Sequence, residues 1–117
     1  KAQANTSSFA FLIKYGKLTA EIYNNNWGRA ILNTNEAIKP NEWSFATLVY
    51  DGIKLILYKN AVLIDQTNVV KPDISSLPLN IGMRSESNRI FKGIMDDIVI
   101  YGKALTKENL ELIYNAK

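Results

Sequence analysis

The chain has 117 residues, of which 47% are hydrophobic and 21% are charged, which fits one globular domain and excludes a second independent one. It contains no cysteine and no histidine, so disulfides, thiolate metal sites and the commonest general base are excluded. The basic residues behind its net charge of +3 are scattered, so we expect no nucleic-acid partner, and its apolar runs are too short to insert into a membrane.

Short apolar runs separated by turn signals at steps of about ten residues predict an antiparallel β-sandwich. The pattern predicts strands near residues 8–14, 18–23, 30–32, 43–50, 54–59, 62–66, 79–82 and 91–101. Gly16, Gly52 and Asn60 tolerate positive φ in three of the turns between them. We therefore expect three tight hairpins.

Two stretches and the C-terminus complete the predicted architecture. Residues 33–42 and 67–78 contain prolines and are expected to carry the chain between sheets. Thr106 is a predicted N-cap, because an apolar face at helical spacing begins with Leu110. The predicted fold class is all-β, a two-sheet antiparallel sandwich with a short C-terminal helix, spanning 1–117 as a single domain.

Three sequence stretches then resemble one known family. They are NEWSFATLVYDGIKLILYKNAVLI, LPLNIGM and FKGIMDDIVIYGKALTKENLELIY, which together cover about two thirds of the chain. In this order and spacing they resemble the laminin-G-like, pentraxin-like jellyroll of the concanavalin A-like lectin/glucanase superfamily. The matching residues are Trp43, Asp51, Gly52, Tyr58, Asn60, Ile81, Gly82, Phe91, Gly93, Asp96, Asp97, Ile98, Tyr101, Leu105 and Tyr114.

The resemblance also implies an incomplete domain. Sandwiches of this kind often run to about 200 residues, so we expect the N-terminal strands to be lacking here. A sheet without its opening strands exposes unpaired backbone and apolar surface, which natural proteins cover. We therefore expect a cleaved, truncated or partly ordered chain, or one completed by another segment of the same precursor or by a partner chain.

The resemblance further implies a structural calcium ion, because many members of this fold carry one. The position that matches is Asp96, whose carboxylate would contribute one ligand alongside backbone carbonyls. The alternative is that Asp96 only caps or hydrogen-bonds a neighbouring loop. Asp96 and Asp97 are adjacent on a predicted strand, so they point to opposite faces and cannot act as an acid pair.

A predicted ligand surface lies around the polar tip that contains Trp27. An indole flanked by Asn25, Asn26 and Arg29 suits a sugar, because pyranose faces stack on the ring while hydroxyls pair with amide and guanidinium groups. Tyr15 is expected to extend this surface, as is Tyr23. The alternative is a Trp27 ring that folds back over the sheet.

Two further features have a functional and a structural interpretation. The polar loop with Arg84, Asn88 and Arg89 is placed to contact a glycan or an acidic partner, but a solvated loop needs no function. Trp43 shares its strand parity with Phe45, which favours core packing over ligand stacking.

Catalysis is not expected, because the glutamates do not fall at the spacing of glycosidase carboxylates along one strand. The isolated glutamates are Glu21, Glu36, Glu42, Glu86, Glu108 and Glu111. The sequence therefore predicts a non-catalytic carbohydrate-binding or adhesive module of a secreted or cell-surface protein, with a glycan or glycoprotein as partner. The alternative is a structural or protein-interaction module completed by another segment or chain.

Overall fold

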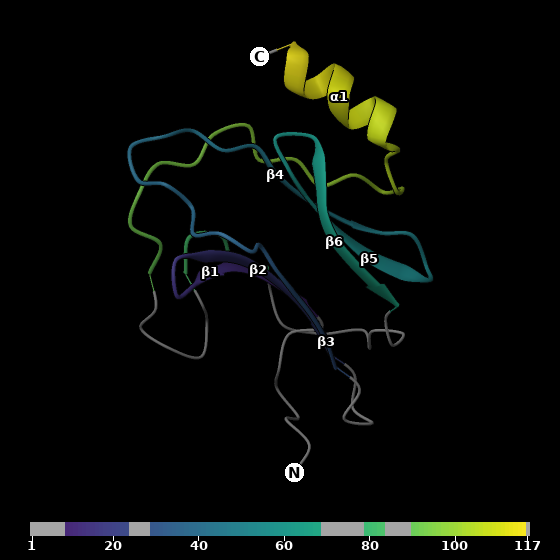
Figure 1. Ribbon diagram of the computed structural model, residues 1–117, viewed down its shortest axis with the longest axis horizontal. Helices are drawn as coiled ribbons and strands as arrows, with labels where there is room; N and C mark the ends of the chain where they lie inside the picture. The colour runs from purple at the N-terminus through teal and green to yellow at the C-terminus, as the bar shows by residue number, and fades with distance from the viewer. Residues whose placement is uncertain (1–8, 24–28, 69–78, 84–89, 117) are drawn as a thin grey trace.

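The computed structural model describes residues 9–23, 29–68, 79–83 and 90–116. These residues form two three-stranded antiparallel sheets and one helix (Figure 1). The first sheet has the order β1-β2-β3 and the second the order β4-β5-β6. Their bounds are β1 Phe9–Lys14, β2 Lys17–Tyr23, β3 Arg29–Asn33, β4 Ala46–Tyr50, β5 Lys54–Lys59, β6 Val62–Asn68 and α1 Lys107–Asn115.

All three predicted hairpins are confirmed, and turn chemistry explains each of them. Gly16 has φ 76° between β1 and β2, and Gly52 has φ 96° between β4 and β5. Between β5 and β6 the chain turns at Asn60, with φ 52°, whose side chain also accepts the Phe45 N–H at 2.9 Å. Each hairpin closes because a residue at its turn adopts a left-handed backbone, which suits the twist of the flanking strands.

The core lies between the two sheets. Leu18, Ala20 and Ile22 of β2 are buried against Leu55 and Leu57 of β5. These residues alternate with polar ones along β2, so one face of that strand points into the core. The predicted crossing at residues 33–42 is confirmed, since it joins β3 of one sheet to β4 of the other.

Helix α1 covers the far face of the second sheet, as Figure 1 shows. Leu110 is 1% exposed and packs with Val49 and Tyr58. The predicted N-cap is confirmed, because the Thr106 hydroxyl accepts the Asn109 N–H and the Asn109 side chain accepts the Thr106 N–H, both at 3.1 Å. This capping box fixes where the helix begins.

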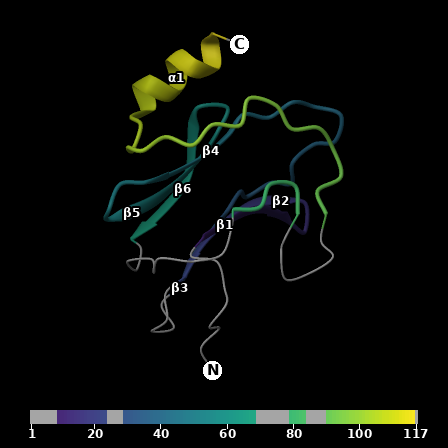
Figure 2. The same cartoon turned by 180° about the vertical axis from the view of Figure 1, so that it is seen from behind.

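The strands predicted at residues 79–82 and 91–101 are not formed. Met83 makes an isolated bridge to Ile90, and the Phe91 N–H donates to the Gly82 carbonyl at 2.7 Å, but residues 92–101 join no ladder. Figure 2 shows the stretch that leads to α1 running along the outside of the sheets. A strand requires a ladder of backbone hydrogen bonds to a neighbouring strand, and within the described ranges residues 92–101 form no such ladder.

The prediction that Trp43 packs in the core is also wrong, because its side chain is 68% exposed. β4 begins only at Ala46, so the strand alternation that placed Trp43 inside does not reach it. The residues of the same parity that do pack, Phe45 and Val49, face α1, where the Phe45 ring stacks on Tyr114 at 5.8 Å.

Candidate functional site

The tip of the β1–β2 hairpin carries an aromatic residue in an unusual backbone conformation. Tyr15 is 91% exposed and has φ 52°, and Gly16 follows it with φ 76°. Positive φ at both central residues is the pattern of a type I′ turn, which favours asparagine, aspartate or glycine at the first of them. Tyrosine is therefore a strained choice, and strain of this kind gathers at functional sites.

The tip is held against the loop that follows β3. The Ile38 N–H donates to the Gly16 carbonyl at 2.7 Å, and the Thr34 N–H donates to the Leu18 carbonyl at 3.0 Å. The Leu18 N–H in turn donates to the Thr34 hydroxyl at 3.2 Å. A Cβ on Gly16 would meet the Ala37 Cβ at 3.4 Å, so hairpin and loop are packed closely. Tyr15 therefore lies at a hairpin tip whose backbone is held in place by hydrogen bonds to the neighbouring loop.

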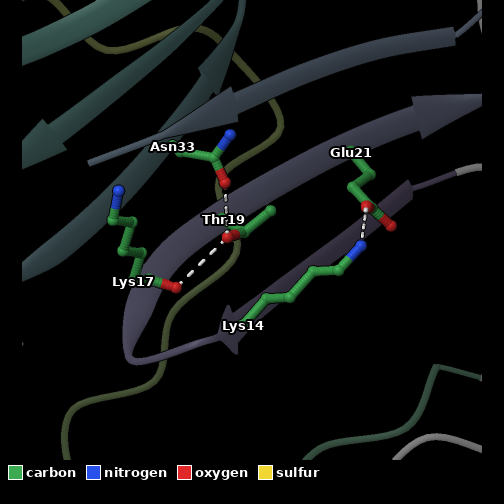
Figure 3. A network of polar contacts seen from close by, with 5 residues as sticks. All are labelled: Lys14, Lys17, Thr19, Glu21 and Asn33. Carbon is green, nitrogen blue, oxygen red and sulfur yellow. Dashed lines mark hydrogen bonds and ion pairs between the residues drawn. The ribbon is translucent and has the colours of Figure 1, made fainter. Parts of the chain in front are cut away.

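Polar residues occupy the face of β2 that points away from the core (Figure 3). The Thr19 hydroxyl lies 2.8 Å from Asn33 Oδ1 and 3.1 Å from the Lys17 carbonyl oxygen, and it donates toward both. Lys14 Nζ lies 3.9 Å from Glu21 Oε2. Thr19 is fully buried and Glu21 is 3% exposed, whereas Asn33 is exposed. The network therefore has a closed inner part and an accessible rim.

The buried half of this network is satisfied. Among the described residues, no buried side-chain nitrogen or oxygen is without a hydrogen-bond partner. That is what a buried carboxylate and hydroxyl require, since a buried polar group without a partner is costly. The sequence alone suggested that Glu21 is isolated. In the sequence, the alternation of the polar residues Lys17, Thr19 and Glu21 indicates one polar face of β2. The strand register then places Asn33 opposite Thr19.

The rim of the network combines with the hairpin tip. Lys14 and Lys17 are direct cross-strand partners on either side of Tyr15 and Gly16, so their side chains leave the same face of the sheet. The Lys14 side chain is 43% exposed and Lys17 is half-buried. The β1–β2 tip, which comprises Lys14, Tyr15, Lys17 and Asn33, offers an aromatic ring, the Lys17 ammonium group and an amide, whereas the Lys14 side chain turns back along the sheet toward Glu21 (Figure 3).

Of the ligand surface predicted around Trp27, the structure describes the side chain of Tyr15, which precedes β2. The predicted ligand residues Asn25, Asn26, Trp27, Arg84, Asn88 and Arg89 lie outside the described residues, and of Arg29 only the backbone is described.

Asp96 lies within residues 92–101, which join no sheet, and is exposed. Its carboxylate accepts the Asp97 N–H at 2.8 Å, a local contact that matches the capping alternative. Within the described ranges, no three acidic side chains come together to hold a metal ion. The predicted site would take its remaining oxygens from backbone carbonyls, so Asp96 as a calcium ligand stays a prediction.

The Asp51 carboxylate accepts backbone hydrogen bonds within the β4–β5 turn, and these bonds shift its pKa. It accepts the Lys54 N–H at 2.7 Å and the Ile53 N–H at 2.9 Å. The bond from Lys54, and then that from Ile53, lowers the pKa of Asp51. Both donors belong to the β4–β5 turn, so this exposed carboxylate stabilises the turn.

Comparison with known proteins identifies the family. Residues 1–111 match the laminin-G-type model described as the concanavalin A-like lectin/glucanases superfamily. A crystal structure of an S-layer domain-containing protein from Clostridium thermocellum matches 85% of this chain with a TM-score of 0.60 and 19% identity. The chain spans about half of that structure, 52% of its length. No curated protein matches. Among the described residues, no helix has the length and apolar character needed to cross a membrane.

Proposed function

Because the chain belongs to the concanavalin A-like lectin/glucanase superfamily, we propose that it is a non-catalytic module that binds carbohydrate. The observation that carries this proposal is Tyr15, which is 91% exposed at a hairpin tip fixed by the Ile38 to Gly16 hydrogen bond. A turn that needed only to close would take glycine or asparagine at this position. An exposed tyrosine there has a reason if its ring contacts a ligand.

The surroundings of Tyr15 suit a sugar. An aromatic ring stacks on the apolar face of a pyranose, and a few polar groups beside it fix the orientation of the hydroxyls. Asn33 is exposed, and its side-chain oxygen is already engaged with Thr19, so its amide N–H groups are left to donate to a hydroxyl oxygen of the ligand. The ammonium group of Lys17 adds a further donor at the same tip.

The superfamily contains both lectins and glucanases, so the assignment as non-catalytic rests on the carboxylates of this chain. Glycoside hydrolysis uses two carboxyl groups flanking the scissile bond. Glu21 is buried and held against Lys14, which removes it from contact with a polymer. Asp96 and Asp97 are adjacent and exposed. We propose that any catalytic activity of a larger protein lies outside this chain.

We also propose that the module works in a secreted or cell-surface protein. The support is the name of the structural neighbour, an S-layer domain-containing protein, together with the absence of cysteine, which bacterial surface proteins tolerate. Glycans or glycoproteins are the partners proposed at that location. Fractionation of cells with an antibody to the full-length protein tests this, and a purely cytosolic pool would contradict it.

The test of carbohydrate binding is a polysaccharide panel probed by affinity gel electrophoresis with the wild type and single variants. We expect at least one polysaccharide to retard the wild type, and Tyr15→Ala to weaken that retardation about tenfold or more. Tyr101→Ala is the matched control, because Tyr101 is a tyrosine that is 50% exposed and belongs to residues 92–101, outside the β1–β2 hairpin. No retardation by any glycan would contradict the proposal.

Trp27→Ala separates the two candidate platforms in the same assay. Loss of binding with Tyr15→Ala and retention with Trp27→Ala would assign the ligand to the β1–β2 tip. The reverse result would assign it to residues 24–29 and would overturn the proposed role of Tyr15.

A second candidate function is favoured by a different observation, the exposed apolar surface. Phe9, Phe11 and Ile13 are 39–47% exposed, and Ile98 and Ile100, within residues 92–101, are 53% and 70% exposed. Exposed apolar side chains on two segments support an interaction role, since contiguous apolar surface is a feature of protein–protein interaction sites. The alternative is a structural module that is completed by an added β-strand from another segment or chain.

Sedimentation analysis of the chain with and without the double substitution Phe11→Lys and Ile98→Lys tests this alternative. We expect the wild type to self-associate and to bind a hydrophobic dye, and the variant to remain monomeric and to bind less dye. A wild type that is monomeric at high concentration and binds no dye would count against it.

A further inference from the structure

We propose that the β1–β2 tip recognises an anionic sugar residue, one that carries a carboxylate or a sulfate. This inference rests on the proposed carbohydrate-binding function and narrows its ligand class. It starts from the placement of two lysines, Lys14 and Lys17, directly opposite each other at the end of the hairpin.

Like charges directly opposite each other on neighbouring strands are destabilising. Opposite charges at the same positions would have stabilised the hairpin, so folding gives no reason for this pair. Glu21 compensates Lys14, but at 3.9 Å the contact is at the limit of an ion pair. Among the described residues, Lys17 has no ion-pair partner within the same limit. The tip therefore carries uncompensated positive charge.

The neighbouring loop adds charges of both signs. Ile38 is bonded to Gly16, which brings the backbone of the adjacent residue, Lys39, close to the tip. Glu36, in the same loop, is exposed, and its backbone carbonyl accepts the Thr34 hydroxyl at 2.8 Å. Glu36 and Glu42 are exposed loop carboxylates, and among the described residues neither forms an ion pair with Lys14 or Lys17.

The lysines lie close to Tyr15, so their positive charge is a candidate subsite for a negatively charged group on the sugar. Lys14 is adjacent to Tyr15 in the chain and Lys17 follows after Gly16, so the Cα atoms lie about 4–6 Å from that of Tyr15. The Lys14 side chain turns toward Glu21 (Figure 3), so Lys17 is the lysine that can reach a substituent of a sugar ring stacked on the Tyr15 ring. A carboxylate or sulfate at that point would gain a charge-assisted hydrogen bond from the Lys17 ammonium group.

The chemistry selects against two other ligands. A neutral sugar would leave the Lys17 ammonium group without compensation, so it is expected to bind more weakly. A polynucleotide would need several phosphate contacts along an extended basic track, and this tip offers one short cluster on a chain with mixed charges.

The experiment compares polygalacturonate with the same polymer after methyl esterification, by affinity gel electrophoresis and calorimetry at 50 mM and 500 mM salt. We expect the acid to bind about tenfold more tightly than the ester at low salt, and the difference to shrink at high salt because screening weakens the ionic contacts. Chondroitin sulfate and desulfated chondroitin form a second matched pair for the sulfate case.

Lys17→Gln is the decisive variant. We expect it to weaken binding of the acid about fivefold while leaving the ester unchanged, with Lys14→Gln giving a smaller effect because Lys14 is shared with Glu21. The control is Lys107→Gln, since Lys107 is exposed on α1 and pairs with Glu111 at 3.3 Å. Equal losses for Lys17→Gln and Lys107→Gln would mean attraction by net charge alone and would overturn the subsite.

The outcomes also separate the anionic preference from carbohydrate binding itself. Equal binding of acid and ester, with both abolished by Tyr15→Ala, would overturn the anionic preference and leave carbohydrate binding intact. If neither these polymers nor any polysaccharide of the panel binds, both fail.

Discussion

Two neighbouring strands of the first sheet show how differently the same kind of residue is buried. Leu18, Ala20 and Ile22 of β2 are 6%, 0% and 3% exposed. Their cross-strand partners on β1 are Ile13, Phe11 and Phe9, which share the same face but are 39–47% exposed. The difference comes from the opposite layer, because Leu55 and Leu57 cover β2 and β3.

This comparison teaches that local pattern fixes which face is apolar, whereas burial depends on what lies across from it. Residues 91–101 repeat the lesson, since they are rich in apolar side chains yet exposed throughout. Both exposed regions have the sequence of an interior element. Both lack a covering layer among the described residues.

The largest expected effect comes from removing a buried side chain of the layer that covers β2. Leu57 is fully buried, so Leu57→Ala should lower the free energy of unfolding by about 2–5 kcal/mol through lost burial and a cavity. Phe11→Ala removes a larger side chain but should have less than half that effect, because Phe11 is already partly in water. Urea denaturation measures both, and equal losses would show that β1 is covered in solution.

Substitutions at the β5–β6 turn test how much the backbone conformation and one side-chain hydrogen bond contribute to stability. Asn60→Ala removes the bond to the Phe45 N–H and places alanine at φ 52°, so we expect a loss of about 1–2 kcal/mol. Asn60→Gly loses the same bond but not the favourable backbone, and its loss should be smaller. A larger loss for glycine than for alanine would contradict this explanation.

The β4–β5 turn gives a pH-dependent prediction. The pKa of Asp51 is lowered in the folded chain, so its contribution is present above the unfolded pKa, about 3.9, and is lost as pH falls through the lowered value. Thermal melts from pH 7 to pH 2 should show the wild type above Asp51→Asn at neutral pH, with the gap closing in acid. A gap that stays constant with pH would show that this carboxylate does not contribute.

The smallest expected effect is a gain in stability. Tyr15→Asn places a residue suited to φ 52° at an exposed turn, so we expect unfolding to become harder by about 0.5–1 kcal/mol. The same substitution should weaken glycan binding. A variant that is destabilised in chemical denaturation would mean that the Tyr15 ring packs on the protein and is not free for a ligand.

Sequence reasoning predicted the features that depend on neighbouring residues. The three hairpins followed from Gly16, Gly52 and Asn60, and the helix start followed from Thr106. It failed for Trp43 and residues 91–101, because their burial depends on elements distant in the chain. The family resemblance supplied the correct fold even where those two local predictions were wrong.

The candidate site was predicted in part. Tyr15 was among the expected ligand residues and is exposed, whereas Trp27 lies outside the described residues. Lys17 and Asn33 were missed because their relation to Tyr15 depends on strand register, which fixes Lys14 opposite Lys17 and Asn33 opposite Thr19. Neither the composition nor a local sequence motif shows which residues lie opposite each other on neighbouring strands.

The most direct test of the central claim is a titration of the isotopically labelled chain with acidic and neutral oligosaccharides, followed residue by residue by NMR. We expect the largest amide shifts at Tyr15, Gly16 and Lys17, with a smaller set at Asn33. Shifts confined to residues 91–101, or no shifts with any sugar, would contradict a binding site at the β1–β2 tip.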